Sequence, residues 1–102
     1  MDKQELVKSL IKVDVKAELI LNRFKEVGLM VEPDGNPNSI STLLYDIQTD
    51  LNTLMCEILG ISLDDDTMRE KYYQSTRKVK SVKNMEAVVN KASEVLLENK
   101  ED

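Results

Sequence analysis

The sequence predicts an all-α fold, a small helical bundle that forms one domain over residues 1–102. Two long segments carry apolar residues at alternating intervals of four and three, the pattern of a helix that packs along a stripe. The prolines and Gly35 fall between these segments, and neither glycine nor proline occurs after Gly60. A chain of 102 residues can bury one hydrophobic core and no more.

The first helix is predicted over residues 2–27. Asp2 and Glu5 have the spacing of a capping box, with Asp2 as the N-cap. Gly28 is placed to end the helix in the left-handed conformation. Its predicted seam consists of apolar residues in steps of four and three: Leu6, Leu10, Val13, Ala17, Ile20, Phe24 and Val27. Further apolar residues widen this stripe: Val7, Ile11, Val15, Leu19 and Leu21.

A second helix is predicted over residues 39–59, after a loop in which Pro33 and Pro37 prevent helix continuation. Asn38 or Ser39 can cap its start, and Gly60 can end it. Its seam repeats the same alternation: Ile40, Leu44, Ile47, Leu51, Leu54 and Ile58. Two long helices with matching seams, joined by the loop of residues 28–38, predict an antiparallel hairpin.

Residues 64–98 form either one long helix or two shorter ones. The apolar stripe changes phase near residue 80, which favours a break between Val79 and Asn84 with Ser81 or Asn84 as the new cap. The alternative is a continuous helix about 50 Å long, which is too long for a compact domain of this size. Such a helix would have to pack on a second chain, so the break separates a monomeric four-helix bundle from an intertwined dimer.

Composition excludes several classes of function. The chain has no histidine, which removes the commonest general base and the commonest zinc ligand, and a single cysteine, Cys56, fits a reducing compartment. A net charge of −5 argues against nucleic-acid binding. No apolar run suits a signal peptide or a membrane span. We expect a cytoplasmic protein that is not an enzyme, with no catalytic residues, metal ligands, cofactor or membrane contact.

Acidic residues are segregated along the chain. Nine of them lie between Glu26 and Met68, where no lysine or arginine occurs. Turn formation accounts for those in the loop, and the helix macrodipole accounts for Asp64–Asp66 at the start of a helix. Three further acids of this segment, Asp46, Asp50 and Glu57, share one ridge of the second helix. This acidic ridge is our candidate partner-binding surface; a solvated face and a divalent-metal site are the alternatives.

The candidate basic counterpart is a patch formed by Arg77, Lys78, Lys80 and Lys83. These side chains can face water, or pair with the acidic ridge within the chain or across a dimer. A nucleic-acid contact is the alternative, although the segment lacks interleaved aromatic residues and glycines.

The stretch TLMCEILGISLDDD, Thr53–Asp66, followed by the pair Tyr72–Tyr73, resembles small uncharacterised proteins of phages and prophages of Gram-positive bacteria. The resemblance implies an origin in a mobile element and no particular activity. Bacteriocin immunity proteins are similar in size and four-helix organisation, but they tend to be basic.

The leading functional hypothesis is a non-enzymatic helical protein–protein interaction module that self-associates, with a dimer favoured, because apolar stripes wider than one neighbour can cover require further partners. The first alternative is an acidic inhibitor or DNA mimic from a phage or mobile element that binds the basic cleft of another protein. The second is a metal-dependent phosphohydrolase.

Overall fold

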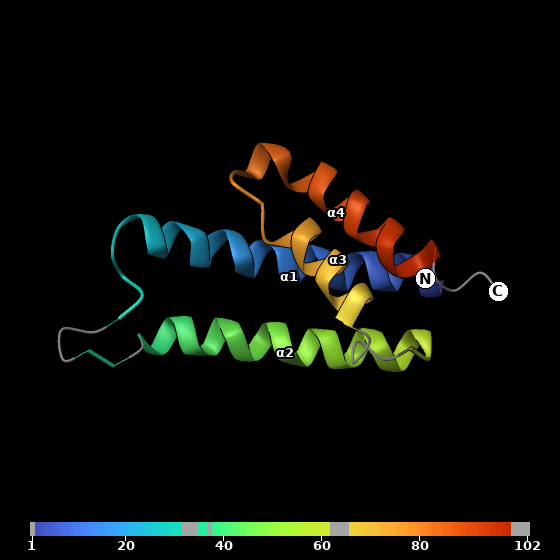
Figure 1. The fold of residues 1–102 in the computed structure, drawn as a ribbon, viewed down its shortest axis with the longest axis horizontal. Coiled ribbons are helices and arrows are strands. Elements are labelled where there is room, and N and C mark those ends of the chain that lie inside the picture. Colours follow the sequence, from blue (N-terminus) through green and yellow to red (C-terminus); the bar gives the residue numbers. More distant parts are fainter. Residues whose placement is uncertain (1, 32–34, 37, 62–65, 99–102) are drawn as a thin grey trace.

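The computed structural model describes residues 2–31, 35–36, 38–61 and 66–98. This part of the chain forms the helices α1 (Lys3–Glu26), α2 (Ser39–Leu59), α3 (Asp66–Thr76) and α4 (Val82–Glu98) (Figure 1). The predicted all-α class is confirmed. No helix in the described ranges is long and apolar enough to cross a membrane.

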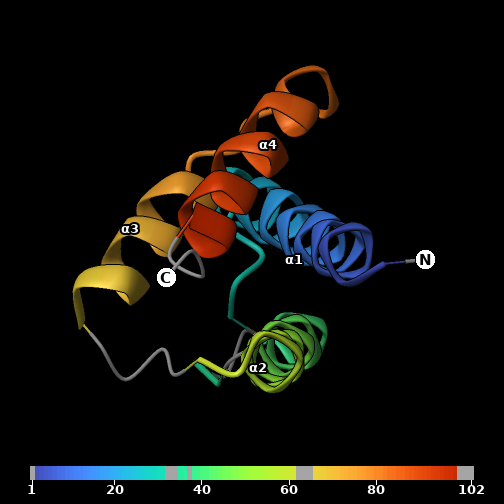
Figure 2. The same ribbon diagram turned by 90° about the vertical axis from the view of Figure 1, so that its right-hand side faces the viewer.

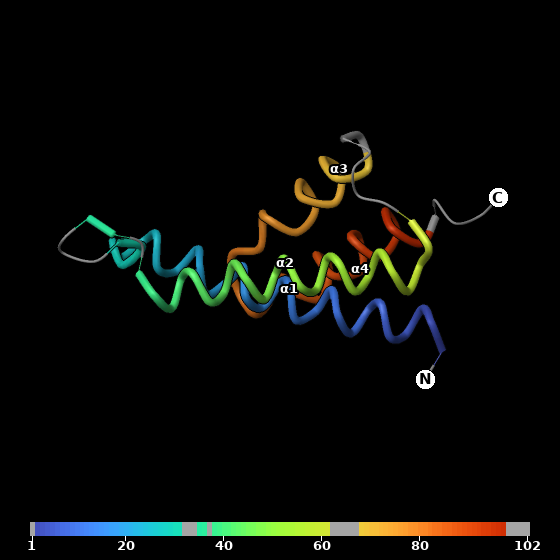
Figure 3. The backbone as a smooth tube through the Cα atoms, turned by 90° about the horizontal axis from the view of Figure 1, so that it is seen from below, coloured from blue at the N-terminus to red at the C-terminus, as the bar shows by residue number. Residues whose placement is uncertain are grey.

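Helices α1 and α2 form the predicted antiparallel hairpin: they run alongside each other in Figure 1 and overlap along much of their length when seen from below in Figure 3. The predicted caps are in place. The Asp2 carboxylate accepts a hydrogen bond from the Glu5 amide at 2.8 Å, and the Asn38 side chain accepts one from the Ile40 amide at 2.9 Å. Gly28 (φ +74°) and Gly60 (φ +66°) adopt the left-handed conformation just after the two helices.

The C-terminal region is broken into two helices, and the alternative of one continuous helix is wrong. Residues 77–81 separate α3 from α4. The two candidate caps act together: the Asn84 amide donates to the Ser81 hydroxyl at 3.3 Å, and the Ser81 amide donates to the Asn84 side chain at 3.2 Å. The break removes the argument for an intertwined dimer, because α4 folds back onto its own chain.

Helix α1 is the centre of the molecule, since α2, α3 and α4 all pack against it. Figure 2 looks along the long helices, with α3 on one side of the α1–α2 pair and α4 beyond α1; no described helix lies on the opposite side of the pair. The core is made of apolar residues from the four helices and the α3–α4 connection: Val7, Ile11, Val15, Met55, Leu59, Tyr72, Val79, Met85, Val89, Ala92 and Leu96.

The predicted seams are only partly buried, and they are not the most buried stripes of the two helices. Every second member of the α1 seam is exposed: Leu6, Val13, Ile20 and Val27. The residues that were expected only to widen the stripe, including Val7, Ile11 and Val15, are fully buried. The physical reason is that α3 and α4 cover the side of α1 that carries these residues, and only α2 packs on the seam side.

Candidate partner-binding face

Two rows of large aliphatic side chains remain exposed on the hairpin. Leu6, Val13 and Ile20 follow one another at intervals of seven residues on α1, and Ile40, Ile47 and Leu54 do the same on α2. Seven residues are close to two helical turns, so each row lies along one face of its helix. Between 38% and 53% of each residue's surface is exposed. We call these six residues the apolar face.

The two rows lie side by side because the hairpin is antiparallel and its register is fixed by Gln48. The Gln48 side-chain amide donates to the Glu18 carboxylate at 3.1 Å and to the Asp14 carbonyl at 3.4 Å, so residue 48 is level with residues 14–18. Ile47 is therefore level with residues 15–19, between Val13 and Ile20, and Leu54 is level with residues 8–12, between Leu6 and Val13, so the two rows interdigitate. Both rows are exposed, as expected for the side of the hairpin opposite α3, where Figure 2 shows no described helix.

Charged residues of opposite sign border the apolar face on its two long edges. On α1 the border is a lysine row, Lys8, Lys12 and Lys16, whose members lie between the apolar residues and α4. On α2 the border is the acidic ridge: Asp50 and Glu57 each follow a residue of the apolar row by three positions, close to one helical turn. All six charged residues are exposed, and none forms an ion pair within the described part of the chain. Across the hairpin the surface therefore changes from basic to apolar to acidic.

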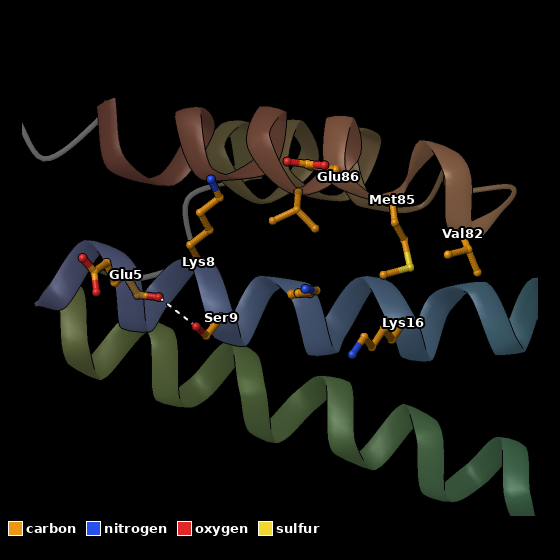
Figure 4. A pocket seen from close by; sticks show the side chains of 9 residues that line it. Glu5, Lys8, Ser9, Lys16, Val82, Met85 and Glu86 are labelled. Carbon is orange, nitrogen blue, oxygen red and sulfur yellow. Dashed lines mark hydrogen bonds between the residues drawn. The ribbon is translucent and has the colours of Figure 1, made fainter. Parts of the chain in front are cut away.

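The lysine row also lines a groove of about 750 Å³ between α1 and α4 (Figure 4). Met85 and Val89 of α4 supply apolar surface along it, and the exposed Val82 lies at the start of α4. Two carboxylates, Glu5 and Glu86, line the groove as well, so three lysines face two acids. Lysines spaced four residues apart repel one another by about 0.2–0.5 kcal/mol per pair, which an acidic partner would relieve.

A buried polar cluster holds α3 to the other side of the hairpin. Asp14 is fully buried and accepts hydrogen bonds from the Tyr72 hydroxyl at 2.5 Å and from the Arg77 guanidinium at 3.3 Å. The Arg77 Nε lies 3.4 Å from the Glu18 carboxylate, which also accepts from Gln48. One guanidinium thus serves two carboxylates of α1. This cluster fixes which side of the hairpin α3 covers, and so which side stays open.

Aromatic contacts extend the cluster to α2. The Arg77 guanidinium lies 4.8 Å from the centre of the Tyr73 ring, within range of a cation–π interaction. The Tyr73 hydroxyl accepts a hydrogen bond from the Asn52 side chain of α2 at 3.3 Å. The cluster therefore connects three helices through side chains.

The Tyr72 hydroxyl predicts a pH dependence of stability. Burial raises the pKa of Tyr72 above its ordinary value of about 10, and the Asp14 carboxylate raises that pKa further, while Arg77 opposes the shift. The folded state therefore keeps a proton that the unfolded chain loses. This contribution to stability is complete below pH 10 and declines above it, by about 1.4 kcal/mol per pH unit.

We expect Tyr72→Phe to lower the free energy of unfolding at pH 7 by about 1–3 kcal/mol, because Asp14 loses a donor. The same variant should lose less stability than the parent between pH 9 and 11. Urea unfolding of both proteins across that range, followed by circular dichroism, measures the difference. Parallel pH profiles would contradict the role assigned to Tyr72.

The structure places the sequence-predicted site residues on two separate surfaces. The acidic ridge is exposed on α2, whereas Lys78, Lys80 and Lys83 are exposed around the α3–α4 connection. Arg77, the fourth member of the predicted basic patch, is turned inward and has a side chain only 27% exposed. The patch and the ridge form no ion pair within the described ranges. Asp64 and Asp65 lie outside the described residues.

Sequence reasoning missed the lysine row and the buried cluster. The signal for the first was the interval of four between Lys8, Lys12 and Lys16. The signal for the second was the pair Asp14 and Glu18, two acids that share a face with the apolar residues Val7 and Ile11. Both sets of residues were recognisable from their spacing within α1. That spacing does not show which residues of the other helices they contact.

Comparisons with protein-family models, with curated proteins and with solved structures find no match for this chain. Among the described residues, no three histidine, cysteine, aspartate or glutamate side chains are grouped so that they could hold a metal ion. The free thiol of Cys56 is half-buried on α2. The feature that stands out on the described surface is the apolar face with its two charged borders.

Proposed function

We propose that this protein is a non-enzymatic helical interaction module that associates with a second copy of itself through the apolar face. The observation that carries the proposal is the regular spacing of the exposed aliphatic residues on both hairpin helices. Scattered apolar residues are normal on a protein surface, but a continuous double row is typical of an interaction site. The interval of seven suits the knobs-into-holes packing of antiparallel helices.

The size of the face is adequate for a modest dimer interface. Helix α2 has 21 residues and spans about 31 Å. Two helices with axes 8–10 Å apart present a strip about 20 Å wide, so the face covers about 600 Å² per subunit. A typical specific interface buries about 800 Å² per partner.

We expect the purified protein to sediment as a dimer at micromolar concentration and the double variant Ile20→Glu/Ile47→Glu to sediment as a monomer. Each carboxylate would be buried without a partner, and symmetry places every substitution in the interface twice. The dissociation constant should therefore rise by at least about 100-fold. Sedimentation velocity over a concentration series measures the change.

Tyr45→Glu is the matched control, because Tyr45 is an exposed apolar residue of α2 outside the two rows. This variant should dimerise like the parent. Circular dichroism should show the helical content of the parent protein in both variants. A parent protein that stays monomeric at about 100 µM, where interfaces of this kind are populated, would contradict self-association.

A second candidate function is supported by the acidic ridge, whose three carboxylates are exposed and carry no ion pair in the described part of the chain. Such a ridge can enter the basic cleft of another protein, as expected for an acidic inhibitor or a DNA mimic from a mobile element. In that case the purified chain remains a monomer, and its complex weakens steeply as ionic strength rises.

A further inference from the structure

We propose that the groove between α1 and α4 receives the acidic ridge of the second copy. In the dimer this places α2 of each chain over α1 of the other. The inference rests on the proposed self-association and adds the orientation of the partner. It is carried by the two charged borders, which the apolar face alone does not explain.

Symmetry leaves two ways to place one hairpin face on another with a two-fold axis. If the axis is perpendicular to the helices, α1 lies over the α1 of its partner and α2 over the partner's α2. Lysine row then meets lysine row, and acidic ridge meets acidic ridge. If the axis is parallel to the helices, α1 lies over the partner's α2, and each lysine row meets an acidic ridge. Charge complementarity selects the second arrangement.

The second arrangement also fixes the register without any adjustable shift. A two-fold axis parallel to the helices allows no translation along itself, so every residue lies at the same height in both copies. Gln48 is level with residues 14–18, which puts Asp50 at the height of residues 12–16, a span that ends at Lys16, and Glu57 at the height of residues 5–9, a span that includes Lys8. Asp46 lies one turn beyond Asp50, within reach of the same lysine.

The lining of the groove is complementary in charge to the acidic ridge of the partner's α2. Its lysines are exposed and form no ion pair with the described residues, and Met85 and Val89 line the groove beside them. Helix neighbours throughout the resulting four-helix arrangement are antiparallel. Exposed ion pairs add little affinity each, so the charged borders select the orientation while the apolar face supplies most of the binding.

Complementary charge reversal tests the orientation. The first variant is Lys8→Glu/Lys16→Glu, and the second is Asp50→Lys/Glu57→Lys. Each variant alone would bring like charges together, so its dissociation constant should rise by at least about ten-fold at low ionic strength. An equimolar mixture restores both sets of opposite charges and should form heterodimers as tightly as the parent protein forms homodimers. Sedimentation velocity of each variant and of the mixture gives the result.

Cysteine pairs supply an independent test in a Cys56→Ser background. Lys16→Cys and Asp50→Cys lie on opposite borders within one chain but face each other across the proposed interface. The double variant should form a covalent dimer on mild oxidation. Lys16→Cys alone should not, because the parallel axis keeps the two copies of residue 16 on opposite edges of the interface. A perpendicular axis near the height of residue 16 would bring those two cysteines together.

The outcomes separate the two proposals. A parent protein that is monomeric overturns self-association and this inference together. If the parent dimerises but both charge variants dimerise equally well, or their mixture fails to recover, only the orientation is overturned. Covalent dimers from Lys16→Cys alone would likewise overturn the orientation and leave self-association standing.

Discussion

Replacement of Arg77 by alanine is expected to lower the free energy of unfolding by about 3 kcal/mol at pH 7. The guanidinium is the cation that balances two carboxylates of α1, one of them fully buried. Its removal leaves the buried Asp14 and Glu18 carboxylates without a counter-ion among the described residues, which costs more than the net contribution of an exposed ion pair. Urea denaturation of the purified protein at fixed concentration measures the loss.

The matched control removes the charges that Arg77 balances. In the triple variant Arg77→Ala/Asp14→Asn/Glu18→Gln, no buried carboxylate remains, so part of the lost stability should return. Lys78→Ala changes a neighbouring exposed lysine and should alter the free energy of unfolding by less than about 0.5 kcal/mol. If Arg77→Ala resembles Lys78→Ala, the cluster does not hold α3 in the way described.

The second large effect separates the two faces of α1. Ile11→Ala should lower the free energy of unfolding by about 3 kcal/mol, because the side chain is fully buried and its removal leaves a cavity. Ile20→Ala should cost less than about 1 kcal/mol in the monomer, because 44% of that residue is exposed. The two substitutions share one helix and one residue type, so differences in helix propensity cancel.

Chemical denaturation at two protein concentrations completes the comparison. The difference in the free energy of unfolding between Ile11→Ala and the parent protein should be the same at both protein concentrations. The loss from Ile20→Ala should grow at high concentration, where the dimer buries Ile20. Equal losses at low concentration would mean that the predicted seam is the true core face of α1 after all.

The ends of the helices were predictable because they depend on residues close together in the sequence. Asp2, Gly28 and Gly60 act where expected, and the Ser81–Asn84 pair caps α4 through bonds between near neighbours. A cap needs only a side chain and the first or last turn of its own helix. The hairpin was predictable as well, because two helices with matched apolar stripes, consecutive in the sequence, bury those stripes by packing against each other.

The faces of the helices were not predictable to the same degree. The stripe on α1 is wide enough to present Val13 or Val15 to the core, and its periodicity alone does not say which. The choice depends on where α3 and α4 pack, and the contact of Tyr72 and Arg77 with Asp14 decides where α3 packs. The sequence spacing also predicted that Arg77 belongs to a surface patch. In the folded chain its guanidinium instead pairs with the buried Asp14 and Glu18 carboxylates.

The sequence by itself therefore determined the all-α class, the hairpin, the helix boundaries to within a few residues and the position of the acidic ridge on α2. Only the tertiary structure decided that half of each seam is exposed and that a lysine row borders it opposite the ridge. The reason is physical: helix formation and capping depend on local contacts, whereas exposure depends on which helices, distant in sequence, cover a given face. The candidate binding surface is the side of the α1–α2 hairpin that neither α3 nor α4 covers.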